Sequence, residues 1–324
     1  MKNVLVTGAG GTIATEIAHR VAAMRPGKLI LLNHSEIALH AIDISIRDRF
    51  PDLNMTTVLA DVRDCEHIRK VMQEHSPSMI FHAAAVKHVP LAEANPIEAI
   101  TTNVFGTLNI MRESWMRSRV LLISTDKAVY PSSVMGATKR VAEMICQLYG
   151  GIVVRFTNVL DSSGSVMPLF RSQIERGGPV TVTHPDVKRF FISIREAVDL
   201  VMYAASNAVH PDSVFVRDGG EPERIVDIAN RMIRESGRGD IEVRMVGLRQ
   251  GEKIDEDLFY EWECPKPTAV DGIQIGTLRA VDPDGLSSAI ESLRKACGKQ
   301  NAGKALAILA SLVPEATLCA AGNN

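Results

Sequence analysis

The sequence predicts an α/β fold, a doubly wound parallel sheet with a smaller C-terminal lobe. Short runs of branched apolar residues, most of them followed by apolar residues at helical spacing, indicate strands that alternate with helices. A glycine-rich turn separates the first such run from the first helix, and polar residues follow the later runs. The runs that predict strands are residues 3–7, 28–32, 56–59, 79–85, 120–123 and 152–155.

The composition is that of a globular chain without a strong charge. Its 324 residues include 36 Lys and Arg and 38 Asp and Glu, which leaves a formal net charge of -2. No overall field therefore favours nucleic acid or an acidic membrane surface. The five cysteines have no paired spacing, and no apolar run reaches the roughly 18 residues of a membrane span. We therefore expect a cytoplasmic protein with no nucleic-acid or membrane partner, and no metal site is predicted.

The first predicted strand leads into the sequence GAGGTIA, residues 8–14, and then into a helical pattern. Glycines between a buried strand and a helix let the backbone approach a pyrophosphate, whose charge then meets the helix N-terminus. Gly8, Gly11, Thr12 and Ile13 are the predicted contacts. This arrangement is typical of a Rossmann-type site, so the predicted cofactor is NAD or NADP.

The ends of the next strands carry further predicted cofactor contacts. Asn33 ends the second strand, where a side chain can bind the adenosine ribose. It lacks the charge that would repel a 2′-phosphate, so NAD and NADP both stay open. Asp61 and Val62 follow the third strand and are predicted to meet the adenine, with helix capping by Asp61 as the alternative. Ala83 and Ala84 are small residues on the fourth strand that leave room for the nicotinamide ribose.

The fifth predicted strand, residues 120–123, leads into the stretch that carries most of the polar chemistry. Residues 124–127 (STDK) come directly after it, at the carboxyl edge of the sheet, where open α/β folds bind ligands. Lys139 lies four residues after Met135 on a predicted helix, so both side chains occupy one helix face. We expect that face to look back toward the polar stretch.

Two predicted helices offer a surface for self-association. The first runs from Pro96 through residue 111, and the second begins at Val134. Such helices can pack across a two-fold axis as a four-helix bundle, and a homo-oligomer, a dimer or larger, is expected. The alternative is that each helix has both faces occupied within one chain.

Four stretches of the chain carry a family resemblance. They are FHAAAVKHVPLAEANPIEAITTNVFGT, STDKAVYPSSVMGATKRVAE, GGPVTVTHPDVKRFFISIREAV and GLRQGEKIDEDL. They resemble the polysaccharide-biosynthesis (CapD-like) branch of the extended short-chain dehydrogenase/reductase family, which contains the UDP-N-acetylglucosamine 4,6-dehydratases. Many members of that branch have an N-terminal membrane region, so the expected match is to their catalytic domain alone.

The resemblance implies a lyase that converts UDP-N-acetylglucosamine, or a close UDP-hexosamine, to a 4-keto-6-deoxy sugar with C5 inversion. Many relatives have a tyrosine where this chain has Met135, and a thioether cannot exchange a proton. Asp126 is therefore predicted to accept the C4 hydroxyl proton, with Thr125 as its hydrogen-bonding partner and Tyr130 as a possible substitute. The resemblance implies that Lys127 takes part in inversion at C5. Lys127 can act as a base only if burial or a nearby cation lowers its pKa.

The resemblance also implies the remaining contacts. Lys139 is predicted to hold the nicotinamide ribose, with Ser124 beside the cofactor. The predicted contacts to the UDP-sugar substrate are Lys87, Asn158, Arg189, Arg249 and Glu252, the two arginines being candidate diphosphate clamps. Two other functions stay open: a nucleotide-sugar C4 or C5 epimerase that removes no water, and a non-catalytic dinucleotide-binding protein.

The predicted organisation has three parts. Residues 1–160 form the NAD(P)-binding Rossmann domain, to which residues 187–205 return. Residues 161–280 form the smaller substrate-binding lobe, and residues 281–324 form a C-terminal helical tail.

Overall fold

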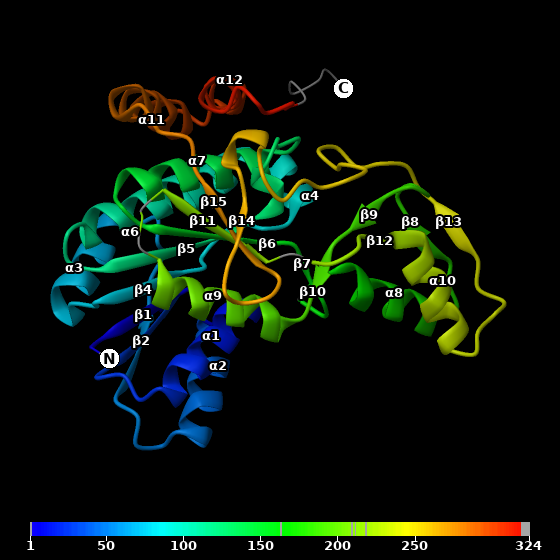
Figure 1. Ribbon diagram of the computed structural model, residues 1–324, viewed down its shortest axis with the longest axis horizontal. Helices are drawn as coiled ribbons and strands as arrows, with labels where there is room; N and C mark the ends of the chain where they lie inside the picture. Colours follow the sequence, from blue (N-terminus) through cyan, green and yellow to red (C-terminus); the bar gives the residue numbers. More distant parts are fainter. Residues whose placement is uncertain (1, 163, 209, 211, 218, 319–324) are drawn as a thin grey trace.

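The computed structural model describes residues 2–162, 164–208, 210, 212–217 and 219–318, and shows a large α/β body with a smaller lobe at one end (Figure 1). This confirms the predicted fold class. The main sheet has nine strands within the described residues. In spatial order they are β14 (Lys266–Pro267), β15 (Ile273–Thr277), β11 (Ser213–Arg217), β6 (Ile152–Phe156), β5 (Arg119–Thr125), β4 (Met79–His82), β1 (Val4–Thr7), β2 (Leu29–Asn33) and β3 (Met55–Leu59).

The first six strands form a parallel sheet in the order β3-β2-β1-β4-β5-β6. This is the strand order of a Rossmann fold, and it reverses between β1 and β4. Every residue of β1, β2 and β6 is buried, because helices cover both faces of a parallel sheet. The reversal point places the loops after β1 and β4 side by side.

The far edge of the sheet corrects the predicted domain boundary. β11 pairs in parallel with β6, β15 pairs antiparallel with β11, and β14 follows β15. All three fall within residues 161–280, which the sequence analysis assigned to the lobe. Since β6 is buried along its whole length, its outer backbone groups need a neighbouring strand, and β11 supplies it.

Helices cover both faces of the sheet. One face carries α1 (Thr12–Ala23), α2 (Glu36–Arg49) and α9 (Ile194–Asn207). The other carries α3 (Cys65–His75), α4 (Val89–Ala94), α5 (Pro96–Ile100), α6 (Thr107–Ser114) and α7 (Val134–Leu148).

The helix predicted from Pro96 forms with one local change, a π-helical turn over residues 101–106 between α5 and α6. Asn103 in this turn is buried, accepts the Val86 N–H at 2.8 Å and donates to the Val86 carbonyl at 3.0 Å. It also donates to Thr138 Oγ1 of α7 at 2.9 Å. The turn thus ties the loop after β4 to α7.

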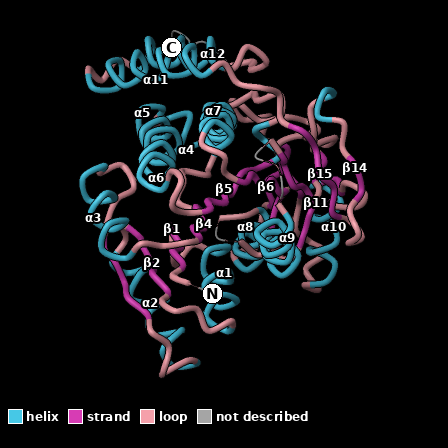
Figure 2. The backbone as a smooth tube through the Cα atoms, turned by 60° about the vertical axis from the view of Figure 1, so that its left-hand side comes forward, coloured by secondary structure: helices cyan, strands magenta, loops and turns pink. Residues whose placement is uncertain are grey.

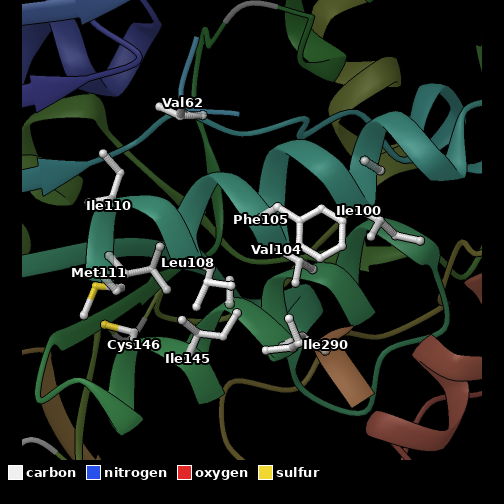
Figure 3. Close-up of a cluster of buried hydrophobic side chains, with 14 of the residues drawn as sticks. Val62, Ile100, Val104, Phe105, Leu108, Ile110, Met111, Ile145, Cys146 and Ile290 are labelled. Atoms are coloured by element: carbon white, nitrogen blue, oxygen red, sulfur yellow. The ribbon is translucent and has the colours of Figure 1, made fainter. Parts of the chain in front are cut away.

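Two C-terminal helices, α11 (Pro283–Gly298) and α12 (Ala302–Leu312), lie over the outer side of α5–α7 (Figure 1 and Figure 2). Figure 3 shows Ile290 of α11 in the same apolar cluster as Val104 and Phe105. The face predicted to meet a second subunit is therefore covered by the same chain, the alternative named above. Residues 319–324 of the predicted tail lie outside the described residues.

The lobe has a small core of its own. It is formed by α8 (Val166–Glu175), α10 (Ile225–Glu235), β8 (Val180–Val182) and β13 (Val243–Met245). Two short strand pairs lie between lobe and sheet, β7 (Asn158–Val159) with β10 (Phe191–Ile192) and β9 (Lys188–Arg189) with β12 (Glu223–Arg224) (Figure 1). No helix in the described residues has the length and apolar character needed to cross a membrane.

Candidate active site

A cavity of about 920 Å³ lies at the carboxyl ends of the parallel strands and extends to the lobe. The predicted cofactor residues that line it are Gly8, Gly11, Thr12, Ile13, Asn33, Asp61, Val62, Ala83, Ala84, Ser124 and Lys139. The other predicted site residues that line it are Lys87, Thr125, Lys127, Met135, Asn158, Arg189, Arg249 and Glu252. Asp126 is the exception, because it is buried behind the lining residues and is 1% exposed.

The glycine loop before α1 fits a pyrophosphate. Gly11 is the N-cap of α1 and no side chain caps the helix, which leaves the positive end of the helix dipole open to an anion. Gly8 has a φ of +68°, and a Cβ there would lie 2.8 Å from the Ala84 nitrogen. Only glycine allows the loop after β1 to pass so close to the end of β4. The described residues therefore fit a dinucleotide along this edge of the sheet.

Asn33 and Asp61 lie at the cavity, and both side chains also have protein partners. Asn33 donates to the Ala9 carbonyl and accepts the Ser35 N–H at 3.1 Å, which holds the glycine loop against β2. Asp61 accepts Arg63 Nε at 2.8 Å and Nη2 at 2.6 Å. Burial raises the pKa of Asp61, but the hydrogen bonds and charge of Arg63 outweigh burial and hold that pKa below its usual value. Asp61 therefore keeps its negative charge at this end of the cavity.

Thr125, Asp126 and Lys127 form a hydrogen-bonded group where β5 ends, called the acid–base group below. Thr125 Oγ1 donates to Asp126 Oδ1 at 2.7 Å, and Lys127 Nζ donates to the same oxygen at 3.0 Å. The other oxygen, Asp126 Oδ2, is buried and has no hydrogen-bond partner in the described part of the chain. Since Asp126 does not line the cavity, its carboxylate can exchange a proton with a ligand there only through Thr125 or Lys127.

Lys127 lies between two carboxylates. Its Nζ is 3.0 Å from Asp126 Oδ1 and 3.5 Å from Glu256 Oε1, and it donates to Asn158 Oδ1 at 3.4 Å. Burial lowers the pKa of Lys127, but Asp126 and Glu256 outweigh burial, so that pKa lies above its usual value. The prediction of Lys127 as a base required a lowered pKa. In this structure Lys127 is an ammonium and needs a group that takes its proton first.

Met135 and Lys139 lie on α7, which begins after Ser133 as the sequence indicated, with Ser133 Oγ accepting the Gly136 N–H. Lys139 Nζ donates to the Ile123 carbonyl at 2.5 Å. Burial lowers the pKa of Lys139 to about 8. Met135 lines the cavity with a thioether, which cannot exchange a proton.

The two predicted diphosphate clamps differ in their surroundings. Arg189 donates to the carbonyls of Lys188 and residues 253–254 at 2.7 to 2.9 Å, which fixes the loop after β13. Arg249 is exposed, and Glu252 Oε2 accepts its backbone N–H at 3.1 Å. The guanidinium of Arg249 is therefore better placed than that of Arg189 to meet a diphosphate.

The sequence analysis missed a buried ionic network behind the site. Arg155 in β6 pairs with Glu143 of α7 at 2.7 Å and with Glu263 at 2.7 Å, and all three side chains have no exposure. Ser124 Oγ donates to Glu143 Oε1 at 2.5 Å, which joins the network to the end of β5. The arginine in the apolar run IVVRF is the signal that could have revealed it, because a buried charge requires partners.

The loop of residues 126–133 is held by segments that come much later in the chain. The hydrogen bonds run from Tyr260 Oη to the Ala128 carbonyl, from the Thr317 N–H to the Pro131 carbonyl, and from Ser132 Oγ to the Gly251 carbonyl, each 2.9 Å long. These contacts fix the loop that joins the acid–base group to α7.

Tyr130, the possible substitute for the missing tyrosine, lies away from the reacting group. Its ring packs edge-on against Tyr260 with centroids 4.6 Å apart, and its hydroxyl accepts the Glu261 N–H at 3.3 Å. It does not line the cavity. Tyr130 is therefore a loop tyrosine that packs against neighbouring aromatic rings.

Gly136→Ala is expected to lower the free energy of unfolding by about 1–3 kcal/mol. A Cβ at Gly136 would lie 2.1 Å from the Lys127 carbonyl oxygen, so α7 would have to move away from the acid–base group. Urea unfolding measures the change. Gly298→Ala is the control, because Gly298 ends α11 with nothing within 4 Å and should tolerate alanine. A Gly136→Ala protein as stable as the wild type would contradict the close approach.

Comparisons with known proteins give one consistent family. The model of the polysaccharide biosynthesis protein family matches residues 4–277. Capsular polysaccharide biosynthesis protein CapD of Staphylococcus aureus is 47% identical over 274 residues, 81% of this chain and 46% of CapD. Probable polysaccharide biosynthesis protein EpsC of Bacillus subtilis is 44% identical over 294 residues, 87% of this chain and 49% of EpsC. The chain thus spans about half the length of these relatives.

A solved structure agrees in fold and in sequence. Pen from Bacillus thuringiensis has a TM-score of 0.79 and 30% identity, with 86% of this chain and 89% of that chain covered. The match to the family model includes the glycine loop, the acid–base group and Lys139. The chain therefore belongs to the polysaccharide biosynthesis protein family, a branch of the extended short-chain dehydrogenases/reductases.

Proposed function

We propose that this protein dehydrates UDP-N-acetylglucosamine, or a close UDP-hexosamine, to a 4-keto-6-deoxy sugar with inversion at C5. The observation that carries the proposal is the pairing of Thr125 and Lys127, both bonded to Asp126, on the cavity that the glycine loop also lines. A protein that only binds a dinucleotide has no need of such an acid–base group. Membership of the polysaccharide biosynthesis family supports a sugar as the substrate.

The cofactor in this proposal is NAD or NADP. Gly8, Gly11, Thr12 and Ile13 would hold its pyrophosphate, and Lys139 its nicotinamide ribose. The bound cofactor supplies oxidation at C4 and reduction at C6 within one catalytic cycle. Because Asn33 is uncharged, both dinucleotides remain candidates.

The residues of the acid–base group divide the proton transfers. Thr125 accepts the C4 hydroxyl proton while its own proton moves to Asp126, along the 2.7 Å hydrogen bond already present. The C4 ketone then acidifies the C5 hydrogen. Lys127, once it has lost its proton, takes the C5 proton and passes one to the C6 hydroxyl, which leaves as water. A proton delivered to the other face of C5 gives inversion.

The remaining contacts would hold the nucleotide and the sugar. Arg249 is the proposed diphosphate contact, with Lys87, Asn158 and Glu252 around the sugar and Arg189 supporting the loop that carries Arg249. A cytoplasmic location and a homo-oligomer remain predictions. An oligomer would need a surface other than the one that α11 and α12 cover.

Incubation of the purified protein with a panel of UDP-sugars in heavy water is expected to give a product lighter by one water and labelled at C5. Mass spectrometry and proton NMR measure both changes, and the same reaction in ordinary water is the control for the label. A product of unchanged mass with an inverted C4 or C5 centre would indicate an epimerase instead. No change in any UDP-sugar would remove the proposed function.

A further inference from the structure

A second, smaller cavity of about 150 Å³ adjoins the first one at Lys127. Lys127 lines both cavities, whereas Glu256 lines only the small one. The small cavity has room for a few water molecules. The exposed residues Pro90 and Arg249 also line it, so it lies close to the protein surface. Lys127 therefore lies between the proposed sugar site and a small chamber, together with Val89, Arg189, Arg249 and Glu252, which also line both cavities.

Glu256 is fixed in that chamber with one oxygen unused. Its side chain is 3% exposed, and its Oε1 lies 3.5 Å from Lys127 Nζ and 3.7 Å from Arg189 Nε. Its Oε2 is buried and has no hydrogen-bond partner among the residues that the structure describes. Lys253 Nζ donates to the Val129 carbonyl at 3.0 Å, which secures the segment before Glu256. A buried carboxylate oxygen without a partner is costly unless it gains a proton or a water.

The charges around Glu256 favour proton uptake. The charged groups that face it are Asp126, Lys127, Arg189, Arg249, Glu252 and Lys253. Burial raises the pKa of Glu256, Asp126 raises it further, and Lys127, Arg189 and Lys253 only partly offset this. Glu256 is thus a stronger proton acceptor than an exposed carboxylate, and it lies beside the one lysine that must lose a proton.

We propose that Glu256 is the proton-relay residue that takes the proton of Lys127 before Lys127 attacks C5 and returns it afterwards, with the small cavity as its link to water. This inference rests on the proposed dehydration. Glu256 touches neither sugar nor cofactor, and it acts through Lys127 alone.

The protons balance in this sequence. Lys127 first gives a proton to Glu256, then takes the C5 proton and gives it to the C6 hydroxyl, which leaves as water. Glu256 then returns its proton to Lys127, which is an ammonium again. The proton that Asp126 gained from the C4 hydroxyl passes back through Thr125 to the other face of C5, so that Asp126 is a carboxylate again. Because the C4 hydroxyl exchanges with water before it is oxidised, the proton that reaches C5 comes from solvent.

Glu256→Gln tests the relay. Its rate of dehydration is expected to fall roughly 100-fold at neutral pH, and to recover as the pH rises, because hydroxide can then remove the Lys127 proton. If Glu256 acted only through its negative charge, the Glu256→Gln substitution would lower the pKa of Lys127 and speed the reaction near neutral pH. Oxidation at C4 should persist, measured as deuterium fixed at C4 when quenched reactions are treated with borodeuteride.

Three comparisons make the outcome decisive. Asp257→Asn is the matched control, since the Asp257 side chain is 55% exposed and, within the described residues, pairs with Lys253 alone, and it should keep the wild-type pH profile. Glu256→Asp keeps the carboxylate and should restore part of the rate at neutral pH. Reductive methylation of Lys127 can be measured by the mass of the peptide that contains it. It should be faster in Glu256→Gln than in the wild type, whatever reaction the enzyme catalyses.

The two proposals fail in different ways. A wild-type protein that dehydrates no UDP-sugar ends the proposed function and the relay with it. A wild type that dehydrates, together with a Glu256→Gln protein that is as fast or faster at neutral pH, ends the relay alone. An unchanged methylation rate of Lys127 would show that Glu256 does not act on its amine, and it would overturn the relay as well.

Discussion

Lys127→Arg is expected to fold, to keep both ion pairs and to lose dehydration by roughly 100- to 10,000-fold. A guanidinium stays charged beside Asp126 and Glu256, so the electrostatics of the site are preserved, but it cannot give up its proton to become a base. Oxidation at C4 does not require that proton. A keto sugar that still carries its C6 hydroxyl should therefore form, and borodeuteride trapping under single-turnover conditions should label it at C4.

Asp126→Asn is the contrasting variant. Its amide can still accept the Thr125 hydrogen bond but cannot take a proton from it, so the reaction should stop before the ketone forms. No C4 label should be trapped. Wild-type turnover by Lys127→Arg, or a trapped ketone in Asp126→Asn, would show that the proton transfers are assigned to the wrong residues.

Arg155→Met is expected to lower the free energy of unfolding by about 3–5 kcal/mol. The change leaves the carboxylates of Glu143 and Glu263 buried, with no exposure, and without their shared cation. Urea unfolding at neutral pH measures the loss. Arg238→Met is the control, because the pair of Arg238 with Asp240 is 46% and 71% exposed and should contribute about 0–1 kcal/mol.

The effect of Arg155→Met should depend on pH. Burial raises the pKa of Glu143, but the charge and hydrogen bonds of Arg155 outweigh burial and hold that pKa below its usual value of 4.5. A depressed pKa stabilises the folded state above 4.5, and the contribution disappears as the pH falls through the folded value. The difference in stability between wild type and variant should therefore narrow in acid. A difference that is constant with pH would show that lost packing, not lost charge pairing, causes the change.

Features that depend on neighbouring residues could be predicted from the sequence. β1, the glycine loop and α1 follow one another within residues 4–23, and Ser133 caps α7 where the pattern indicated. The hydrogen bond between Thr125 and Asp126, which are neighbours in the sequence, was also predicted.

Features that depend on distant segments could not be predicted. Glu256 reaches Lys127 from another part of the chain, and nothing in GEKIDEDL distinguishes it from the acids beside it. The pKa of Lys127 is raised, and not lowered as a base would require, because the distant Glu256 joins Asp126 beside it. β11 has the branched apolar sequence SVFVR, but that pattern could not say that β6 was its neighbour.

Synthesis from the N-terminus produces the two halves of the site at different times. The strands β1 to β6, the glycine loop and the acid–base group all precede residue 160, so a nascent chain can begin to assemble the dinucleotide half early. The groups that hold residues 126–133 in place, Gly251, Tyr260 and Thr317, leave the ribosome much later. The loop of residues 126–133 can therefore take its final position only after residue 317 has left the ribosome, well after the dinucleotide half of the site.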